Sequence, residues 1–273
     1  MINLPEKIGL IAGKGRFPAL ISEKIQKSSP NTKIVVAGFK GQTGGEIKKF
    51  ADRIRYFELG SIGRMITYFR ENGIEKAVMA GLVSHGKIFD NNIEFDETAA
   101  QVFGALKDQK ADSILGGFTS KLAENGIEML SVLDFVNEHL AVPGVMTAAA
   151  PTPFEKEDMA FGFNLAKEIS RLDTGQTVVV KRKCVVAIES IEGTDRCILR
   201  GGSLAGAGAV IVKVAKLHQD LRFDLPVIGI RTIKILKKIK SKAIAVEAGK
   251  TCLIDIGEVI KTADNYGISI VGM

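Results

Sequence analysis

The stretch Ile8-Gly9-Leu10-Ile11-Ala12-Gly13-Lys14-Gly15-Arg16-Phe17-Pro18 decides the fold, because an apolar run leads directly into a glycine-rich turn and the start of a helical pattern. A short apolar run closed by glycine is typical of a buried strand. A strand that feeds a helix begins a βαβ unit, in which the next strand lies parallel to the first. We therefore predict an N-terminal Rossmann-like domain built on a parallel sheet.

The residues that follow continue this alternation and then lose it. Predicted strands cover 33–39, 54–59, 77–80 and 127–132, and predicted helices cover 18–27, 62–72, 97–109 and 112–125. We expect Ser61 to cap the second helix and Gly73 to end it in a left-handed conformation. After residue 132 the periodicity fades and prolines appear, as is typical of a linker. We place the Rossmann-like domain at residues 1–132 and the linker at 133–152.

The second half predicts a distinct C-terminal α/β domain over residues 153–273, which we take as the catalytic domain. It opens with a helix over 155–172, and strand-like segments dominate after it. The glycine-rich stretch 201–208 lacks the Gly-Lys-Ser/Thr ending of a P-loop, and we expect it to be a mobile loop. Basic residues along 234–242 share a helical pattern with apolar ones, which indicates a core helix with a solvated basic face.

Composition narrows the partners and the compartment. Lys and Arg number 37 against 31 Asp and Glu, and the net charge of +6 favours anionic partners. The chain has no Trp and three Tyr, so the stacking surface of a single-strand binder is missing and we expect no nucleic acid. Three widely spaced cysteines fit a reducing compartment. The first residues lack a leader pattern, and no apolar stretch is long enough for a membrane span, so we expect a cytoplasmic location.

The first candidate site is the turn from Gly13 to Pro18. Backbone N–H groups at a helix start can hold a phosphate there. The third glycine of the dinucleotide fingerprint is replaced by Pro18, and Lys40 follows the second strand where an NAD site needs an acid, so NAD is disfavoured. The alternative is that the glycines only make a tight turn between strand and helix.

Two further candidates lie in the second half. The segment 187–195 ends a strand with two or three carboxylates around a glycine and a hydroxyl, an arrangement suited to magnesium; an acidic turn with Thr194 as a helix cap is the alternative. The segment 213–226 runs from a strand into a loop rich in acids, bases and an amide. Its Lys and Arg suit phosphate oxygens, while Asp220 and Asp224 suit a metal ion or a water; surface salt bridges are the alternative.

Taken together, these segments resemble the LpxI family of UDP-2,3-diacylglucosamine pyrophosphatases. The resemblance extends over essentially the whole chain. It rests on residues 9–18, Asp173-Thr174-Gly175-Gln176, Ile191-Glu192-Gly193-Thr194-Asp195, and above all Gln219-Asp220-Leu221-Arg222-Phe223-Asp224-Leu225-Pro226 with Gly229 and Thr232 after it. Each piece alone is weak, whereas the combination is specific.

The resemblance implies magnesium-dependent hydrolysis of UDP-2,3-diacylglucosamine to UMP and 2,3-diacylglucosamine 1-phosphate (lipid X), a step of lipid A synthesis in Gram-negative bacteria. It also implies a homodimer that contacts the cytoplasmic face of the inner membrane. The residues that match the family's motifs take the following expected roles. Asp224 and Asp220 are catalytic; Asp224, Glu192 and Asp195 bind the metal; Gly13, Gly15, Arg16, Phe17, Pro18, Thr194, Lys213, Gln219 and Thr232 bind the substrate.

Two other functions fit parts of the pattern. One is a nucleotide-binding regulatory protein without chemistry, in which the glycine turn holds the nucleotide. The other is an NADP-dependent oxidoreductase with Lys40 at the 2′-phosphate. Loss of activity in Asp224→Ala separates the enzyme from the regulatory protein, and NADPH binding tests the oxidoreductase.

Overall fold

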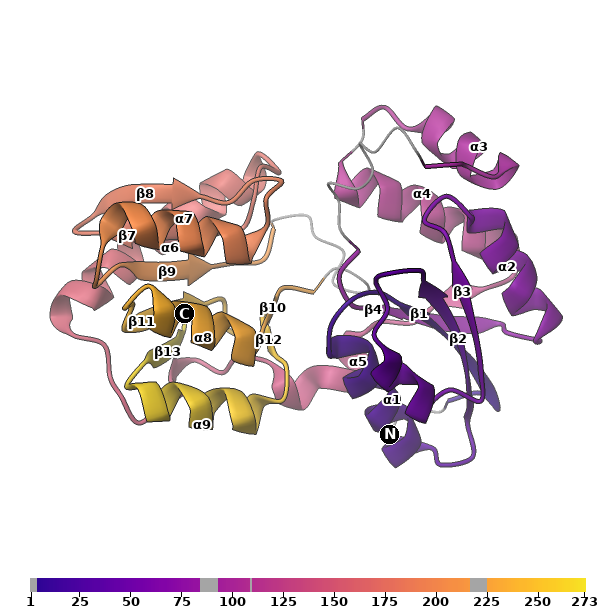
Figure 1. The fold of residues 1–273 in the computed structure, drawn as a ribbon, viewed down its shortest axis with the longest axis horizontal. Helices are drawn as coiled ribbons and strands as arrows, with labels where there is room; N and C mark the ends of the chain where they lie inside the picture. The colour runs from indigo at the N-terminus through magenta and orange to yellow at the C-terminus, as the bar shows by residue number, and fades with distance from the viewer. Residues whose placement is uncertain (1–3, 84–92, 109, 217–224) are drawn as a thin grey trace. The chain divides into compact units, whose positions relative to one another are not determined.

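The computed structural model describes residues 4–83, 93–108, 110–216 and 225–273 of the chain (Figure 1). Contacts divide the described residues into two compact units, one running to Asn137 and the other starting at Glu138. The hydrophobic clusters follow this division, because one cluster draws on residues 11–127 and two others draw on residues 141–271. Each unit therefore has a core of its own, as an independently folding domain needs.

The N-terminal unit is a five-stranded parallel sheet with helices on both faces, which confirms the predicted Rossmann-like class. The strand order is β3-β2-β1-β4-β5, and every pairing is parallel. Helices α1 and α5 contact each other on one face, and the cluster around Phe69 joins α2, α3 and α4 on the other (Figure 1). The elements are β1 (Lys7–Ala12), α1 (Phe17–Ser28), β2 (Lys33–Phe39), η1 (Gly45–Lys49), β3 (Arg53–Phe57), α2 (Ile62–Glu71), β4 (Lys76–Ala80), α3 (Glu97–Ala105), α4 (Ala111–Glu124), β5 (Glu128–Met129) and α5 (Leu133–Val136).

The start of α2 differs from the prediction in its cap. Ser61 occupies the N-cap position, but its side chain makes no capping hydrogen bond and instead accepts one from Arg64 Nη2 at 2.8 Å. Asp96 takes over the capping: its Oδ2 accepts from the backbone N–H of Arg64 at 3.1 Å, and its Oδ1 accepts from the N–H of Ala99 in α3 at 2.9 Å. One carboxylate from a distant segment thus satisfies two helix starts, which no local pattern around Ser61 predicts. At the other end, Gly73 has φ +68°, as predicted.

The C-terminal unit is built on a six-stranded mixed sheet, separate from the first sheet. Its order is β6-β13-β11-β9-β7-β8, in which β13, β11 and β9 are parallel and the others are antiparallel to their neighbours; β10 and β12 form a small parallel pair. The elements are η3 (Asn137–His139), β6 (Gly144–Val145), α6 (Pro153–Arg171), β7 (Thr177–Lys181), β8 (Cys184–Ile188), α7 (Thr194–Ala205), β9 (Val210–Lys213), β10 (Val227–Ile228), α8 (Ile230–Lys238), β11 (Ala243–Val246), β12 (Cys252–Leu253), α9 (Ile256–Tyr266) and β13 (Ser269–Gly272).

The glycine-rich stretch 201–208 is not the loop we predicted, because α7 continues through it to Ala205. A Cβ at position 201 would lie 2.6 Å from Val179 Cγ2, and one at position 202 would lie 2.4 Å from Ile239 Cβ. Glycine at these two positions lets the helix approach β7 and the end of α8 closely. Packing therefore outweighs the low helix propensity of glycine, which makes each glycine about 1 kcal/mol less favourable than alanine inside a helix.

Several short elements were also longer in the prediction than they are in the structure. The strand expected over 127–132 is reduced to β5, and the helix expected over 97–109 ends at Ala105. Residues 133–152 contain α5, η3 and β6, and β6 pairs with β13 of the C-terminal sheet. Among the described residues, no helix is both long and apolar enough to cross a membrane.

Candidate active site

The first candidate, the turn between β1 and α1, is fixed by a close approach to the end of β4. The N–H of Gly13 donates to the carbonyl O of Ala80 at 2.8 Å, and Lys14 exchanges backbone hydrogen bonds with Leu82 at 2.8 and 3.0 Å. A Cβ at position 13 would lie 2.7 Å from the carbonyl of Gly81, so glycine is required there. Gly15 has φ +99° and faces open space. These contacts bring the carboxyl ends of β1 and β4 together, where ligands bind in open parallel sheets.

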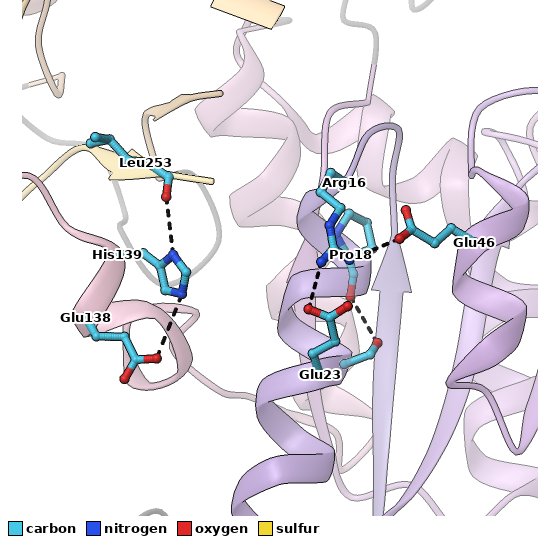
Figure 2. Close-up of polar contacts among 8 residues, drawn as sticks. Arg16, Pro18, Glu23, Glu46, Glu138, His139 and Leu253 are labelled. Carbon is cyan, nitrogen blue, oxygen red and sulfur yellow. Dashed lines mark hydrogen bonds and ion pairs between the residues drawn. The ribbon is translucent and has the colours of Figure 1, made fainter. Parts of the chain in front are cut away.

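The same turn keeps the donors of a helix start. Among the described residues, no side chain caps α1, and the first turn of this helix has no acidic residue. Arg16, by contrast, is held by carboxylates, because Nη2 lies 2.8 Å from Glu23 Oε2 and Nη1 lies 3.2 Å from Glu46 Oε1 (Figure 2). Phe17 and Pro18 are buried. Backbone N–H groups, rather than the Arg16 charge, are thus what this turn offers to an anion.

The second candidate region lies at the carboxyl edge of β9 in the C-terminal sheet. Lys213 is the last residue of β9, and the sheet register sets it beside Val246 of β11 and Thr177 of β7. Glu189 directly follows β8, and its N–H donates to the carbonyl O of Thr177. Thr194 begins α7 after Gly193, whose φ is +81°. Antiparallel pairing of β7 with its two neighbours is what brings these residues, distant in sequence, to one edge.

Their side chains form a hydrogen-bonded row. Lys213 Nζ donates to Thr194 Oγ1 at 2.8 Å, and Thr194 Oγ1 donates to Glu189 Oε1 at 2.9 Å. The hydroxyl of Thr177, which is completely buried, lies 3.5 Å from that of Thr194. The structure therefore joins Thr194 and Lys213, two residues predicted to bind substrate, and adds Glu189 to them.

The row is buried and incompletely satisfied. Lys213 is 4% exposed and Glu189 is 7% exposed. Within the described part of the chain, the Lys213 ammonium has Thr194 as its hydrogen-bond partner and forms no ion pair, and Glu189 Oε2 has no hydrogen-bond partner at all. Buried charges are normally paired, so these two groups have bonding capacity that a ligand can fill. A buried ammonium with free donors suits a phosphate oxygen.

A neighbouring carboxylate at the same edge, that of Glu247, has hydrogen-bond or ion-pair partners for both of its oxygens. Glu247, which follows β11, accepts from Lys167 Nζ of α6 at 3.0 Å and from the N–H of Ala215 at 2.9 Å, and it pairs with Lys250 at 2.9 Å. Burial raises the pKa of Glu247, but the hydrogen bonds from Lys250, Ala215 and Lys167 outweigh it and hold the pKa below its usual value. Glu247 is therefore a structural anchor between α6, β11 and the segment after β9.

Of the residues predicted to bind metal, Glu192 and Asp195 each pair with an arginine, and Asp224 lies outside the described residues. Glu192, just before α7, forms an ion pair with Arg200 of that helix, and Asp195 Oδ2 lies 2.7 Å from Arg231 Nε of α8. The Arg200 guanidinium holds the pKa of Glu192 below its usual range. The described residues hold no group of three His, Cys, Asp or Glu side chains arranged for a metal ion. At this edge, Glu189 Oε2 is a buried carboxylate oxygen without a hydrogen-bond partner among the described residues.

Thr232 has a local role: its Oγ1 accepts from the N–H of Gly229 at 3.5 Å, at the start of α8. Gln219, Asp220 and Asp224 lie outside the described residues, between the end of β9 and the start of β10.

Lys40, which an NADP site would use, is exposed and pairs with Glu58 at 2.9 Å. His139 is buried with Nδ1 3.3 Å from the carbonyl O of Leu253 and Nε2 3.9 Å from Glu138 Oε1, a packing arrangement (Figure 2).

The functional group that sequence reasoning did not single out is Glu189. The segment 187–195 was predicted to carry two or three useful carboxylates, but nothing in its spacing separates Glu189 from Glu192. The available signal was its position as the first residue after a strand, where a side chain meets the sheet edge. The structure separates the two acids, because Glu189 is buried beside Thr194 while Glu192 pairs with Arg200.

Comparison with known proteins identifies the family of this chain. The model of the LpxI N-terminal domain matches residues 7–139, and the model of the LpxI C-terminal domain matches residues 142–271. The chain belongs to the LpxI family. A relative of this LpxI chain is the UDP-2,3-diacylglucosamine pyrophosphatase LpxI of Caulobacter vibrioides, 27% identical over 284 residues that cover 98% of this chain and 97% of the relative. The β1–α1 turn lies in the first LpxI domain, and the Lys213 row lies in the second.

Proposed function

We propose that this LpxI family member is a hydrolase that cleaves the pyrophosphate of UDP-2,3-diacylglucosamine into UMP and 2,3-diacylglucosamine 1-phosphate, in lipid A biosynthesis. The matches to both LpxI domain models and the activity in the name of the Caulobacter relative support this assignment. In this reaction, water attacks the phosphorus attached to the sugar and UMP leaves. The site must offset the charge of two phosphates and hold that water.

The observation that carries the proposal is the buried ammonium of Lys213 beside Thr194, which forms no ion pair with any described residue. In the proposed complex, Lys213 binds an oxygen of the pyrophosphate, and Thr194 binds through its backbone at the start of α7, because its hydroxyl proton goes to Glu189. A charge-assisted hydrogen bond is about twice as strong as a neutral one, and burial strengthens it further. The donors of the Gly13–Pro18 turn belong to the proposed nucleotide or phosphate side. This second anion site is supported by the absence of a side-chain cap on α1.

Magnesium is the cofactor of the proposed reaction. Bound Mg²⁺ would offset charge on the phosphate oxygens and polarise the phosphorus that water attacks. Asp224, Glu192 and Asp195 remain the proposed ligands from the family motif, and Asp224 and Asp220 the proposed catalytic residues. For Glu192 and Asp195 this requires exchange of their arginine partners, Arg200 and Arg231, for the ion.

The proposed substrate also sets the surroundings of the protein. A sugar with two acyl chains stays in a membrane, so we propose transient contact of this chain with the inner-membrane surface, for which the net charge of +6 favours anionic headgroups. A homodimer remains a proposal from the family resemblance. The expected compartment is the cytoplasm, where the nucleotide-sugar substrate is available.

The experiment that tests the function is UMP release from UDP-2,3-diacylglucosamine by the purified protein. Wild type and Asp224→Ala are each assayed with magnesium and with EDTA. We expect UMP from wild type with magnesium alone, and a loss of at least about 100-fold in Asp224→Ala if Asp224 holds the metal or the water. If nucleotide binds but no UMP forms with any protein, the chain is a binding protein and the proposed hydrolase is wrong.

A further inference from the structure

Glu189 stands out among the buried acids of the C-terminal unit because one of its two oxygens is held and the other is left over. Oε1 accepts the hydrogen bond from Thr194 Oγ1 at 2.9 Å, whereas Oε2 is buried and has no hydrogen-bond partner among the residues that the structure describes. Leaving a buried acceptor unmet costs about 1–3 kcal/mol, and more for a charged group. The fold tolerates this cost at Glu189, which is 7% exposed, near Lys213, which is 4% exposed.

The neighbours of Glu189 fix the carboxylate in one orientation. The Thr194 hydroxyl is itself oriented by Lys213 Nζ at 2.8 Å, so its proton points to Glu189 Oε1. The backbone of Glu189 is tied to Thr177 and packs on Gly175, where a Cβ would lie 2.0 Å from the Glu189 carbonyl O. The carboxylate is thus placed by β7, β8, β9 and α7 together, and Oε2 is the oxygen that the described residues leave without a partner.

We propose that Glu189 is the general base that activates the attacking water, an inference that rests on the proposed function. A phosphate bound to Lys213 would lie near Glu189, since the Thr194 hydroxyl forms hydrogen bonds with both side chains. We place the attacking water at Oε2, on the side of that phosphate. Held geometry with one free oxygen is what a base needs, because the oxygen must point at the water before the reaction starts.

The step balances as follows. The water oxygen forms a bond to the phosphorus attached to the sugar, and one water proton passes to Glu189 Oε2. The other proton stays on the new phosphate oxygen. The bond between that phosphorus and the bridging oxygen breaks, and the bridging oxygen leaves as part of UMP. Glu189 returns its proton to solvent after the products leave.

The test compares UMP release by wild type, Glu189→Gln, Glu189→Ala and Glu247→Gln in the full-length protein with magnesium. Glutamine keeps the size of residue 189 and a hydrogen bond with Thr194 but cannot accept a proton. We expect kcat to fall by about 10²- to 10⁴-fold with little change in KM. Added formate should restore activity to Glu189→Ala, where the deletion leaves room for a carboxylate, and not to Glu189→Gln.

Glu247→Gln is the matched control, because Glu247 is equally buried at the same edge but has all its partners. We expect it to lose stability and keep kcat close to that of wild type. Binding of Mn²⁺, measured by electron paramagnetic resonance, should be the same in wild type and Glu189→Gln.

Three results would overturn the inference while the hydrolase stands: a Glu189→Gln kcat within about tenfold of wild type, an equal loss in Glu247→Gln, or a loss of Mn²⁺ binding in Glu189→Gln, which would make Glu189 a metal ligand. A wild type without UMP release overturns both the hydrolase and the base.

Discussion

At the scale of single residues, Lys213 is an ammonium that the folded chain buries without an ion pair among the described residues. Lys213→Met keeps the length of the side chain and removes the charge. We expect KM for the nucleotide-sugar to rise by about 10- to 100-fold, since a hydrogen bond to a charged group contributes about 1.5–3 kcal/mol. The free energy of unfolding should stay equal or rise, because burying an unpaired charge is costly. Steady-state kinetics and thermal unfolding check the two effects, and an unchanged KM with lower stability would contradict the assignment.

Gly13 makes a second residue-scale prediction. A Cβ there would lie 2.7 Å from the backbone of Gly81, so Gly13→Ala forces β1 and the end of β4 apart. We expect a loss of about 1–3 kcal/mol in the free energy of unfolding. Gly116→Ala is the control, since Gly116 lies within α4 and a Cβ would meet nothing within 4 Å. It should stabilise the helix by up to about 1 kcal/mol. Urea unfolding followed by circular dichroism compares them, and equal effects would rule out the close approach.

At the scale of elements, Glu247 ties α6 to the carboxyl edge of the sheet, and its hydrogen bonds hold its pKa below the usual 4.5. A lowered folded-state pKa favours the carboxylate in the folded protein. Its stabilisation is therefore complete above about pH 5 and is lost as the pH falls through the folded-state pKa. We expect the melting temperature of Glu247→Gln to lie below that of wild type at neutral pH, and the two to converge as the pH falls through the folded-state pKa of Glu247. A difference that stays constant across this range would exclude the linkage.

Elements also show what local sequence predicts well. Long periodic segments such as α6 and runs such as β2 were predicted within two residues of their observed bounds, because their pattern and caps are contained in the segment itself. α6 even has the capping box of Thr152 and Glu155 at its start. The errors came where another segment decides the outcome. Asp96 replaces Ser61 as the cap of α2, and Val179 and Ile239 make room for the glycines of α7.

At the scale of the whole molecule, each of the two units has its own sheet and its own apolar clusters. We predict that a fragment of residues 138–273 folds by itself, because clusters of this kind need no apolar residue from the first unit. The fragment should show a cooperative thermal transition and dispersed amide NMR signals, but no UMP release without the Gly13–Pro18 turn. A fragment that shows no cooperative transition would mean that the second core depends on the first unit.

The sequence by itself determined the fold class and the family, because contiguous residues are enough to recognise both. The run from Ile8 to Pro18 predicts a parallel sheet through its own periodicity and turn, and motifs such as Ile191-Glu192-Gly193-Thr194-Asp195 need only contiguous residues to be recognised. The tertiary structure alone decided which acid at the C-terminal edge has unused capacity. Glu189 and Glu192 look alike along the chain, yet β-strand pairing buries the first beside Thr194 and Lys213, and helix α7 pairs the second with Arg200. Burial and charge pairing depend on residues that are distant in sequence, so no local pattern contains them.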